Sequence, residues 1–596
     1  MMKRLIFGII FMYILGYNLY GAHPKKTRLK VKSVTYQGNE HFRARHLNNI
    51  ILSRPSTWIS PSYYNDDLFQ GDLVGIPQFY QQNGYLEARL TDYNVDIDSS
   101  KKSVKIDFTI EEGKLTRIEG ISILDNTIIS DQEIQKIISV REGKAFKSRE
   151  IENSTLAILR KYAEIGYLDT DINPDIRINN QSHMALIDFI VNEKTQYHIG
   201  NISITGLEKT KPAIVLRELN FNAGELVNYS KLLQSQRQLY LTGLFQSVFI
   251  RPVSADTNHN ATKDILIETK ENKYGEFNVS IGYGTVEKIR GKTEILYTNL
   301  GGTGQKVGLA TSLSFITRSI EVSFTEPWTF HTRWRTDLTS TWEYLIEPGY
   351  NLERLGARIA VGRKFLNRSS STISYRHENN RLSQIKITDI PAAMKSNIRA
   401  LKLSLVFDNR DNLFNTSKGS YIEFSNELAG SFMSGTNSFF RSNLRLKQFF
   451  STGKGTVWGT YLDLGWIDAP EGFSTVPLNE RFYAGGPNVL RAFGYQLAGP
   501  VDGDRTPSGG RYQFVWNVIE MRQPVYKSFG LETFVDLGNV WDKPRDVAIS
   551  DIRHSIGIGI RYNSPIGLAR LDYAVNFSPR PGEAGAKLYF NMAQAF

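Results

Sequence analysis

Residues 273–596 carry a long run of alternating segments, and this pattern restricts the fold more than any other feature of the chain. About 16 segments of roughly 9–14 residues recur, separated by Gly, Asn, Asp, Ser and Pro clusters; examples are "EFNVSIGYG", "SIGIGIRYN" and "GLARLDYAVNF". Apolar and polar residues alternate along each segment, which is the period of a β-strand with one apolar face. Tilted strands of this length can cross a bilayer. We therefore expect a 16-stranded antiparallel transmembrane β-barrel over residues 273–596.

The overall composition agrees with a barrel whose interior is polar. The mean hydropathy is −0.31, which is low for a membrane protein unless half of each strand faces a wet lumen. Closing the sheet also removes strand edges that hydrocarbon could not satisfy. The alternative is a soluble β-sandwich or propeller, but such folds usually have shorter strands with less aromatic alternation.

The N-terminus reads "MMKRLIFGIIFMYILGYNLYGAHP". Lys3 and Arg4 precede an apolar run from Leu5 to about Leu15, which is too short to span a bilayer as a helix. A basic start, a short apolar run and small residues at Gly21 and Ala22 predict a secretory signal peptide over residues 1–22. An uncleaved anchor is the alternative. The sequence has no cysteine, which excludes a lipoprotein, a disulfide framework and thiolate metal sites.

Residues 30–272 contain a threefold repeat. Each unit is predicted to run strand, helix, helix, strand, strand, giving α+β (βααββ) repeats over 30–114, 115–195 and 196–272. The second helix of each unit ends at a glycine, namely Gly84, Gly166 and Gly243, which we interpret as a left-handed C-cap before a strand. The strands that follow these glycines are candidate sheet edges: "RLTDYNVDI", "INPDIRI" and "FQSVFIRPV".

Charge and motifs exclude several functional classes. The net charge is +11, and residues 273–596 hold 38 Lys and Arg against 29 Asp and Glu, spread along the strands. A nucleic-acid binder would more often concentrate such charge in one stripe. The stretch "GGTGQKVG" from Gly301 lacks the ending of a phosphate loop and is better explained as a hairpin turn. No catalytic or metal-ligand motif is present, so we expect no enzyme, no metal and no cofactor.

Three such repeats ahead of about 16 strands resemble the BamA/TamA family of outer-membrane assembly factors, whose periplasmic repeats are called POTRA domains. The most specific likeness is "RFYAGGPNVLRAFGY" from Arg481, which resembles the family's long sixth extracellular loop. Its matching residues are Gly485, Gly486, Arg491, Phe493 and Gly494. The motif glycine after the arginine is Ala492 here, which would be strained if that position needed a positive φ angle. "SFTEPW" with Pro327 and "DNRDNLFNTSKGSYIEF" also resemble the family.

The resemblance implies a set of partners for this loop. The family's motif arginine folds into the lumen and meets acidic and aromatic residues on the next strands, and Glu520, Phe534 and Asp536 match those positions. An acid facing the lumen near an arginine also gains a charge-assisted pair, whereas an acid facing lipid would be costly. The alternative is that these are unrelated lumen charges.

The function implied is assembly, insertion or translocation of outer-membrane proteins. Unfolded β-rich clients would bind the POTRA edges in the periplasm and enter the bilayer through a lateral seam between the first and last strands, near Glu276, Gly284, Lys587, Phe590 and Phe596. Outer-membrane lipid would be a second partner. Rival hypotheses are a two-partner-type secretion pore and a passive channel with periplasmic modules. The choice between a BamA-type and a TamA-type role, and binding of accessory lipoproteins or an inner-membrane partner, stay open.

Overall fold

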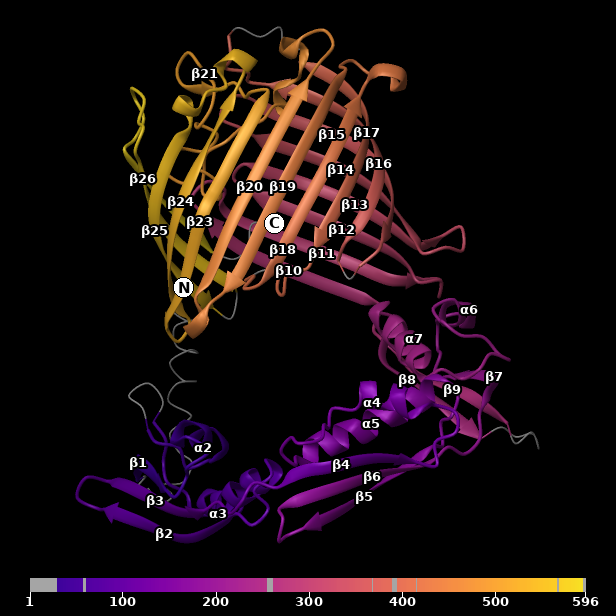
Figure 1. Ribbon diagram of the computed structural model, residues 1–596. Helices are drawn as coiled ribbons and strands as arrows, with labels where there is room; N and C mark the ends of the chain where they lie inside the picture. The colour runs from indigo at the N-terminus through magenta and orange to yellow at the C-terminus, as the bar shows by residue number, and fades with distance from the viewer. Residues whose placement is uncertain are drawn as a thin grey trace, which may run out of the picture. The chain divides into compact units, whose positions relative to one another are not determined.

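The structure is a computed structural model of the whole chain, shown in Figure 1. It describes residues 29–56, 61–254, 261–366, 368–388, 394–413, 415–564 and 567–592. The signal segment predicted for residues 1–22 and the seam residue Phe596 lie outside these ranges. Contacts divide the chain into two compact units, of which the second combines Ile204–Glu218, Arg237–Val248 and Glu268–Phe596.

The first repeat has the predicted element order. It consists of β1 (Lys30–Gln37), α2 (Ala44–Ile50), α3 (Asp66–Gln82), β2 (Arg89–Asp98) and β3 (Ser103–Glu111). Asn65 caps α3 by accepting from the amides of Asp67 and Leu68. Apolar side chains from both helices and from the inner faces of β1 and β3 form one core, with Tyr80 and Phe108 fully buried.

The other two repeats have the same order. The second contains β4 (Arg117–Leu124), α4 (Asp131–Ile137), α5 (Ser148–Glu164), β5 (Asp171–Asn179) and β6 (Met184–Asn192). The third contains β7 (His198–Thr205), α6 (Pro212–Leu216), α7 (Tyr229–Leu241), β8 (Phe245–Ser254) and β9 (Thr262–Glu271). The three sheets have the orders β1-β3-β2, β4-β6-β5 and β7-β9-β8. The strand after each glycine turn (β2, β5 or β8) is therefore a sheet edge, as the sequence predicted.

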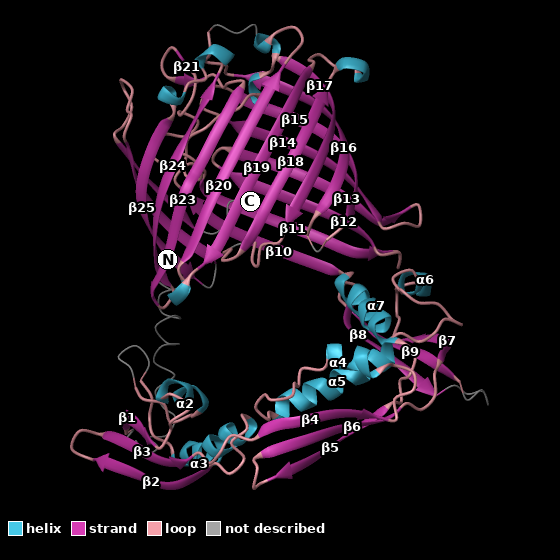
Figure 2. Ribbon diagram, in the orientation of Figure 1, coloured by secondary structure: helices cyan, strands magenta, loops and turns pink. Residues whose placement is uncertain are grey.

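Residues from Gly275 onward form a closed barrel of sixteen strands, in which each strand neighbours the next and the last returns to the first. Figure 2 shows the strands as a continuous magenta wall. The predicted fold class is confirmed. The strands are β10 (Gly275–Gly284), β11 (Lys288–Leu300), β12 (Gln305–Ser314), β13 (Thr317–Thr329), β14 (Trp334–Ile346), β15 (Asn351–Lys364), β16 (Ser370–Ser383), β17 (Lys395–Asp408), β18 (Gly419–Ala429), β19 (Phe439–Ser451), β20 (Val457–Asp468), β23 (Tyr512–Tyr526), β24 (Phe529–Trp541), β25 (Arg553–Ser564), β26 (Gly567–Asn576) and β27 (Ala586–Met592).

Side-chain alternation explains how a polar sequence makes this wall. On β25, Ile556, Ile558 and Ile560 are exposed on the outer face, whereas Ser555 and Arg561, which flank them, are buried inside. An antiparallel strand has this period of two, so one face meets lipid and the other meets the lumen.

We call the end of the barrel where β10 begins the repeat end and the end where β10 finishes the loop end. None of the helices in the described ranges is long and apolar enough to cross a membrane.

The "GGTG" turn joins β11 to β12 at the repeat end, as predicted, and it also makes a contact inside the second unit. Gly302 has φ of 74° and accepts a hydrogen bond from the Lys211 amide at 3.0 Å. A Cβ at Gly302 would collide with the Lys209 carbonyl oxygen. Trp328 on β13 reinforces this contact by donating its indole N–H to Glu218 at 2.6 Å. The glycines of this turn therefore allow close backbone approach rather than phosphate binding.

Candidate functional site: a lumenal loop and the barrel seam

The long connection between β20 and β23, residues 469–511, folds into the barrel. It contains only short elements: η3 (Phe473–Thr475), η4 (Leu478–Glu480), β21 (Val501–Asp502) and β22 (Thr506–Pro507). Its central residues Leu490, Ala492 and Phe493 are almost fully buried and pack against inward-facing wall residues such as Phe534 and Ala574. The apolar cluster gives this connection a core of its own inside the lumen, so it is a packed element rather than a free surface loop.

The two adjacent glycines make the inward turn sterically feasible. Gly485 and Gly486 have φ of 104° and 129°, a region that side chains rarely adopt. A Cβ at Gly485 would lie 2.6 Å from the Gly494 carbonyl oxygen. The two limbs of the turn are joined by backbone hydrogen bonds, from Gln496 to Gly485 at 3.1 Å and from Ala498 to Ala484 at 2.9 Å.

Ala492, where the resembling family has glycine, is accommodated without left-handed strain. It is not among the residues with positive φ, whereas Leu490, two positions earlier, has φ of 52°. The methyl group of Ala492 is buried in the apolar cluster. The tip of this loop therefore takes its left-handed residue before the arginine, and the alanine contributes packing.

Arg491 lies at the centre of the loop and makes a dense set of charged contacts. Its Nε and Nη2 donate to the two carboxylate oxygens of Asp536 at 3.0 Å each, a bidentate pair. Its Nη1 donates to Glu532 at 2.7 Å and to Glu520 at 3.3 Å. The guanidinium carbon lies 3.2 Å from the ring centroid of Phe534. The structure thus brings together Arg491 and its three predicted partners.

Burial by itself would lower the pKa of Arg491, which is only 2% exposed. The carboxylates of Asp536, Glu520 and Glu532 outweigh that effect and raise the pKa above its ordinary value. The arginine is therefore permanently charged, and the loop tip cannot leave this seat without exposing buried carboxylates that lack a partner.

Glu532 is a partner that the sequence reasoning missed. It is fully buried and also pairs with Arg561 of β25. A signal was present: Glu532, Phe534 and Asp536 are spaced by two residues on β24, so all three face the lumen. Around the loop tip, Arg522 pairs with Glu520 at 2.6 Å. The site is thus a network of alternating charges rather than one ion pair.

A second charged contact holds the other half of the loop, again unpredicted. Glu480 in η4 pairs with Arg376 of β16 at 3.0 Å and with Arg441 of β19 at 2.7 Å. Burial would raise the pKa of Glu480, but the two guanidinium groups outweigh it and lower the pKa to about 2. The polarity is reversed relative to Arg491: here the loop supplies the acid and the wall supplies the arginines.

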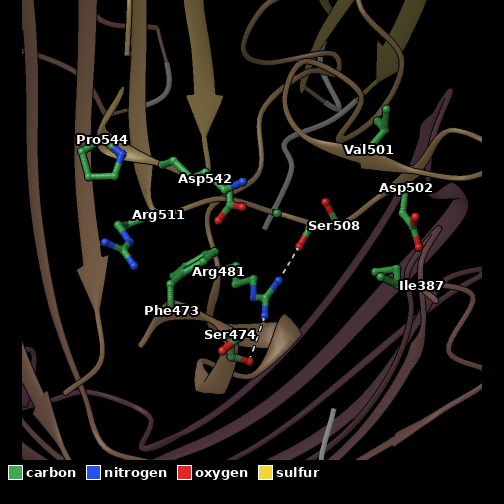
Figure 3. A pocket seen from close by; sticks show the side chains of 12 residues that line it. Ile387, Phe473, Ser474, Arg481, Val501, Asp502, Ser508, Arg511, Asp542 and Pro544 are labelled. Carbon is green, nitrogen blue, oxygen red and sulfur yellow. Dashed lines mark hydrogen bonds between the residues drawn. The ribbon is translucent and has the colours of Figure 1, made fainter. Parts of the chain in front are cut away.

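The loop also borders a cavity of about 420 Å³ near the loop end, shown in Figure 3. Arg481 lines it and donates to the backbone carbonyls of Val476 at 3.0 Å and Ser508 at 3.2 Å. Its guanidinium lies over the Phe473 ring at 4.7 Å. These contacts fix the entry and exit of the loop to each other, so the cavity is part of the loop's own framework.

The loop tip reaches the last strand of the barrel. The Tyr589 hydroxyl on β27 donates to the Phe493 carbonyl oxygen at 2.6 Å, and Arg570 on β26 donates to the Pro487 carbonyl oxygen at 2.7 Å. Two further residues of the loop, Tyr495 and Gln496, hydrogen-bond to Glu347, which directly follows β14. The loop tip therefore connects directly to one side of the seam.

The seam itself has little backbone pairing. Every residue of β10 from Gly275 to Gly284 is paired with β11, but in the described ranges only Tyr283 with Met592 and Gly284 with Asn591 are paired across β10 and β27. Thr285 adds a hydrogen bond from its amide to the Phe590 carbonyl oxygen at 2.9 Å. Both pairs lie at the loop end of β10 but at the opposite end of β27, where Met592 is opposite Ala569 near the start of β26. Of the predicted seam residues, Gly284 is paired with Asn591, and the carbonyl of Phe590 accepts the hydrogen bond from Thr285. Within the described ranges Glu276 is paired only with β11, and Lys587 is paired with Ala574 of β26.

The repeat glycines have positive φ of 101°, 90° and 75° at Gly84, Gly166 and Gly243, as a left-handed C-cap requires. The first two do more than end a helix. The Gly84 carbonyl accepts from the Thr116 amide at 2.8 Å and the Gly166 carbonyl from the Tyr197 amide at 2.9 Å, each at the start of the next repeat. The sequence did not predict that these glycines also join successive repeats.

No cluster of three or more His, Cys, Asp or Glu residues suited to a metal occurs in the described ranges.

Comparison with known proteins decides the family. A family model described as the Omp85 superfamily domain matches residues 299–596, and a model described as the surface antigen variable number repeat (POTRA) matches residues 29–113, 116–194 and 197–272. The chain belongs to the Omp85 superfamily. Within it, the chain is of the BamA/TamA type predicted from its sequence. Its barrel lies in the outer membrane, and its POTRA repeats lie in the periplasm.

Relatives of this Omp85 protein match it over nearly its full length. "Outer membrane protein assembly factor BamA" of Neorickettsia risticii is 23% identical over 95% of this chain and 78% of its own length. The protein of that name from Neisseria meningitidis is 22% identical over 95% and 78%. The crystal structure of BamA from Haemophilus ducreyi lacking POTRA domains 1–3 has a TM-score of 0.68, with 19% identity, covering 80% of this chain and 99% of that one. The last comparison supports the fold.

Proposed function

We propose that this Omp85 protein inserts β-rich proteins into the outer membrane. The relatives named above are outer-membrane protein assembly factors. The observation that carries the proposal is the contrast at β27: within the described residues this strand has two paired positions with β10, whereas Tyr589 links it to a strongly anchored loop. Such a barrel can part at one place while the rest of the wall keeps its register.

The POTRA repeats supply the receiving surface in this proposal. β2, β5 and β8 are edge strands with unpaired backbone groups, and an extended client segment can add a further strand to any of them. Exposed apolar side chains flank that backbone, including Tyr93 and Ile97 on β2, Ile178 on β5 and Phe249 on β8. Main-chain hydrogen bonds tolerate sequence variation, which suits a receptor for many clients.

The seam supplies the exit. Within the described residues, the part of β10 at the repeat end is paired only with β11, and this is the end where a client would arrive. A client strand that pairs with β10 has its hydrogen bonds satisfied as it enters hydrocarbon, where unsatisfied backbone groups are costly. The loop centred on Arg491 acts as an internal strut that keeps β23 to β27 in place during opening.

Folding of a client tests this function directly. The purified protein is reconstituted in liposomes, an unfolded outer-membrane β-barrel client is added, and its heat-modifiable folding is followed alongside ion conductance. We expect faster client folding than in empty liposomes. Conductance without faster folding would contradict the proposal and support a passive channel, and release of one dedicated exoprotein across the membrane would support a secretion pore.

A further inference from the structure

The outer wall carries an unusual ladder of cations at the loop end of β16 and β17. The register places Arg381 opposite Lys395 and His377 opposite Arg399, with Asn379 opposite Asn397 between them. Cross-strand partners have Cβ atoms about 4.5–5.5 Å apart, and like charges directly opposite each other are destabilising. The repulsion between these cations therefore requires a compensating interaction.

These side chains face outward. Ile373 on β16 and Leu401 on β17 share their parity and are 53% and 40% exposed, as expected of residues that meet lipid. Ile398 and Ala400, of opposite parity, are fully buried in the lumen under the long loop. Along the outer face the surface therefore changes from apolar at mid-wall to basic at the loop end.

One carboxylate lies beside the ladder, because Glu353 of β15 is opposite Arg381 in the register, and it faces three cations: Arg381, Lys395 and Arg399. Among the described residues, neither Arg381 nor Lys395 has a salt bridge, and the one acid nearby, Glu353, accepts from the Trp342 indole at 3.4 Å. The central amides are already oriented, because Asn397 Nδ2 donates to Asn379 at 2.7 Å and lies 2.8 Å from His377 Nε2.

The ladder also borders a hollow. A cavity of about 380 Å³ opens on this face. Its lining combines the apolar side chains of Trp342 and Leu355 with two cations, Arg381 and Lys395, one acid, Glu353, and the amides of Asn379 and Asn397. A tryptophan at the end of the apolar band is typical of the interface between hydrocarbon and headgroups. The hollow therefore lies where a lipid headgroup lies.

We propose that this site binds the phosphate headgroup of an anionic lipid in the outer leaflet. The phosphate would lie between Arg381 and Lys395 and remove their mutual repulsion, while the acyl chains extend along Leu355, Ile373 and Leu401. Charge-assisted hydrogen bonds to phosphate suit both cations. β16 and β17 are the seventh and eighth of the sixteen strands, about halfway round the barrel from the seam. The bound lipid would stabilise the part of the wall that lies opposite the seam. This lipid-binding role is additional to the proposed function and does not depend on it.

Lipid retention tests the site without any activity assay. The full chain is equilibrated in mixed micelles of phosphatidylglycerol and phosphatidylcholine, and the bound lipids are counted by native mass spectrometry. The variant is Arg381→Gln with Lys395→Gln. The matched control is Arg358→Gln with Lys364→Gln, which removes the same charge from the lumen-facing side of neighbouring β15. Two surface cations correspond to roughly a tenfold or larger preference for an anionic lipid.

We expect the wild type and the control to retain phosphatidylglycerol over phosphatidylcholine, and the variant to lose roughly tenfold of that preference. Arg381→Lys should keep it, because the charge remains. Equal preference in wild type and variant would overturn the site. A parallel arm in neutral detergent adds inorganic phosphate instead of lipid. If phosphate alone protects the protein against heat as well as phosphatidylglycerol does, the site takes a free anion and the lipid assignment is wrong.

Discussion

The long loop and the seam are opposite solutions for holding a barrel together. The loop is held by side chains: Arg491 meets three carboxylates and Glu480 meets two arginines, all largely buried. The seam is held by backbone, with Tyr283 and Gly284 as the only residues of β10 paired to β27 in the described ranges. Backbone pairing can be exchanged for an incoming strand, whereas a buried charge network cannot be exchanged without large cost. The comparison suggests that stability resides in the loop and exchange at the seam.

Removing the arginine should have the largest effect. Arg491→Ala leaves Glu520, Glu532 and Asp536 close together and without their shared cation, and breaking such a buried pair costs about 3–5 kcal/mol. We expect a lower midpoint of heat-modifiable unfolding and slower client folding. Arg491→Lys keeps the charge but loses the bidentate geometry, so its unfolding midpoint should lie between those of the wild type and Arg491→Ala. An unchanged midpoint in Arg491→Ala would show that the loop does not support the barrel.

The reversed anchor should matter somewhat less. Glu480→Gln leaves Arg376 and Arg441 without that acid, but Arg376 keeps Glu378 and Glu427 as partners. We expect a loss of about 2–3 kcal/mol in the free energy of unfolding, measured by urea titration of the tryptophan fluorescence. As a matched control, Glu471→Gln changes an exposed acid of the same loop and should have almost no effect. If both variants behave alike, Glu480 is not an anchor.

The stability of the loop should depend on pH through Glu347, which contacts it. Burial raises the pKa of Glu347, which holds Tyr495 and Gln496, to about 7, against 4.5 in the unfolded chain. The folded state therefore binds this proton more tightly than the unfolded chain does. Protonated Glu347 makes its full contribution to the free energy of unfolding below about pH 4.5. That contribution, up to about 3 kcal/mol, is lost as pH rises through 7. Unfolding midpoints measured from pH 5 to 8 should fall more steeply for wild type than for Glu347→Gln. Identical slopes would contradict this assignment.

The link between loop and seam should have the smallest effect. Tyr589→Phe removes one hydrogen bond to the Phe493 carbonyl and costs about 1 kcal/mol. Because the ring remains, packing is kept. We expect the substitution to accelerate backbone hydrogen exchange in β27 more than in β24, measured by mass spectrometry. The midpoint of global unfolding should stay nearly unchanged. Uniform change across both strands would mean that the loop does not act on the seam in particular.

The sequence predicts the fold well because the fold depends on periodic features. Alternation along each strand requires only local chemistry, and β25 shows it residue by residue. The left-handed glycines Gly84, Gly166 and Gly243 were likewise predictable, since few residues other than glycine adopt that conformation readily. The domain boundaries and the signal peptide over residues 1–22 stay predictions.

The site is harder to predict because its contacts depend on where a long loop runs. Many charged residues face the lumen of a barrel, and the pattern does not say which of them the loop meets. Glu532 is on the same face as Asp536 and was still missed, and Glu480 depends on arginines 104 and 39 residues away in the sequence. Ala492 shows the same limit: the likeness suggested strain, but the left-handed residue is Leu490. The roles of the loop and seam residues stay proposals.

A disulfide across the seam tests the central claim most directly. Gly284→Cys with Asn591→Cys joins residues that are paired across β10 and β27, and the chain has no other cysteine to compete. The control, Ser280→Cys with Lys292→Cys, joins β10 to β11, which should never part. We predict that the oxidised seam variant loses client folding in liposomes and regains it on reduction, while the control is active in both states. Full activity of the oxidised seam variant would contradict a lateral opening.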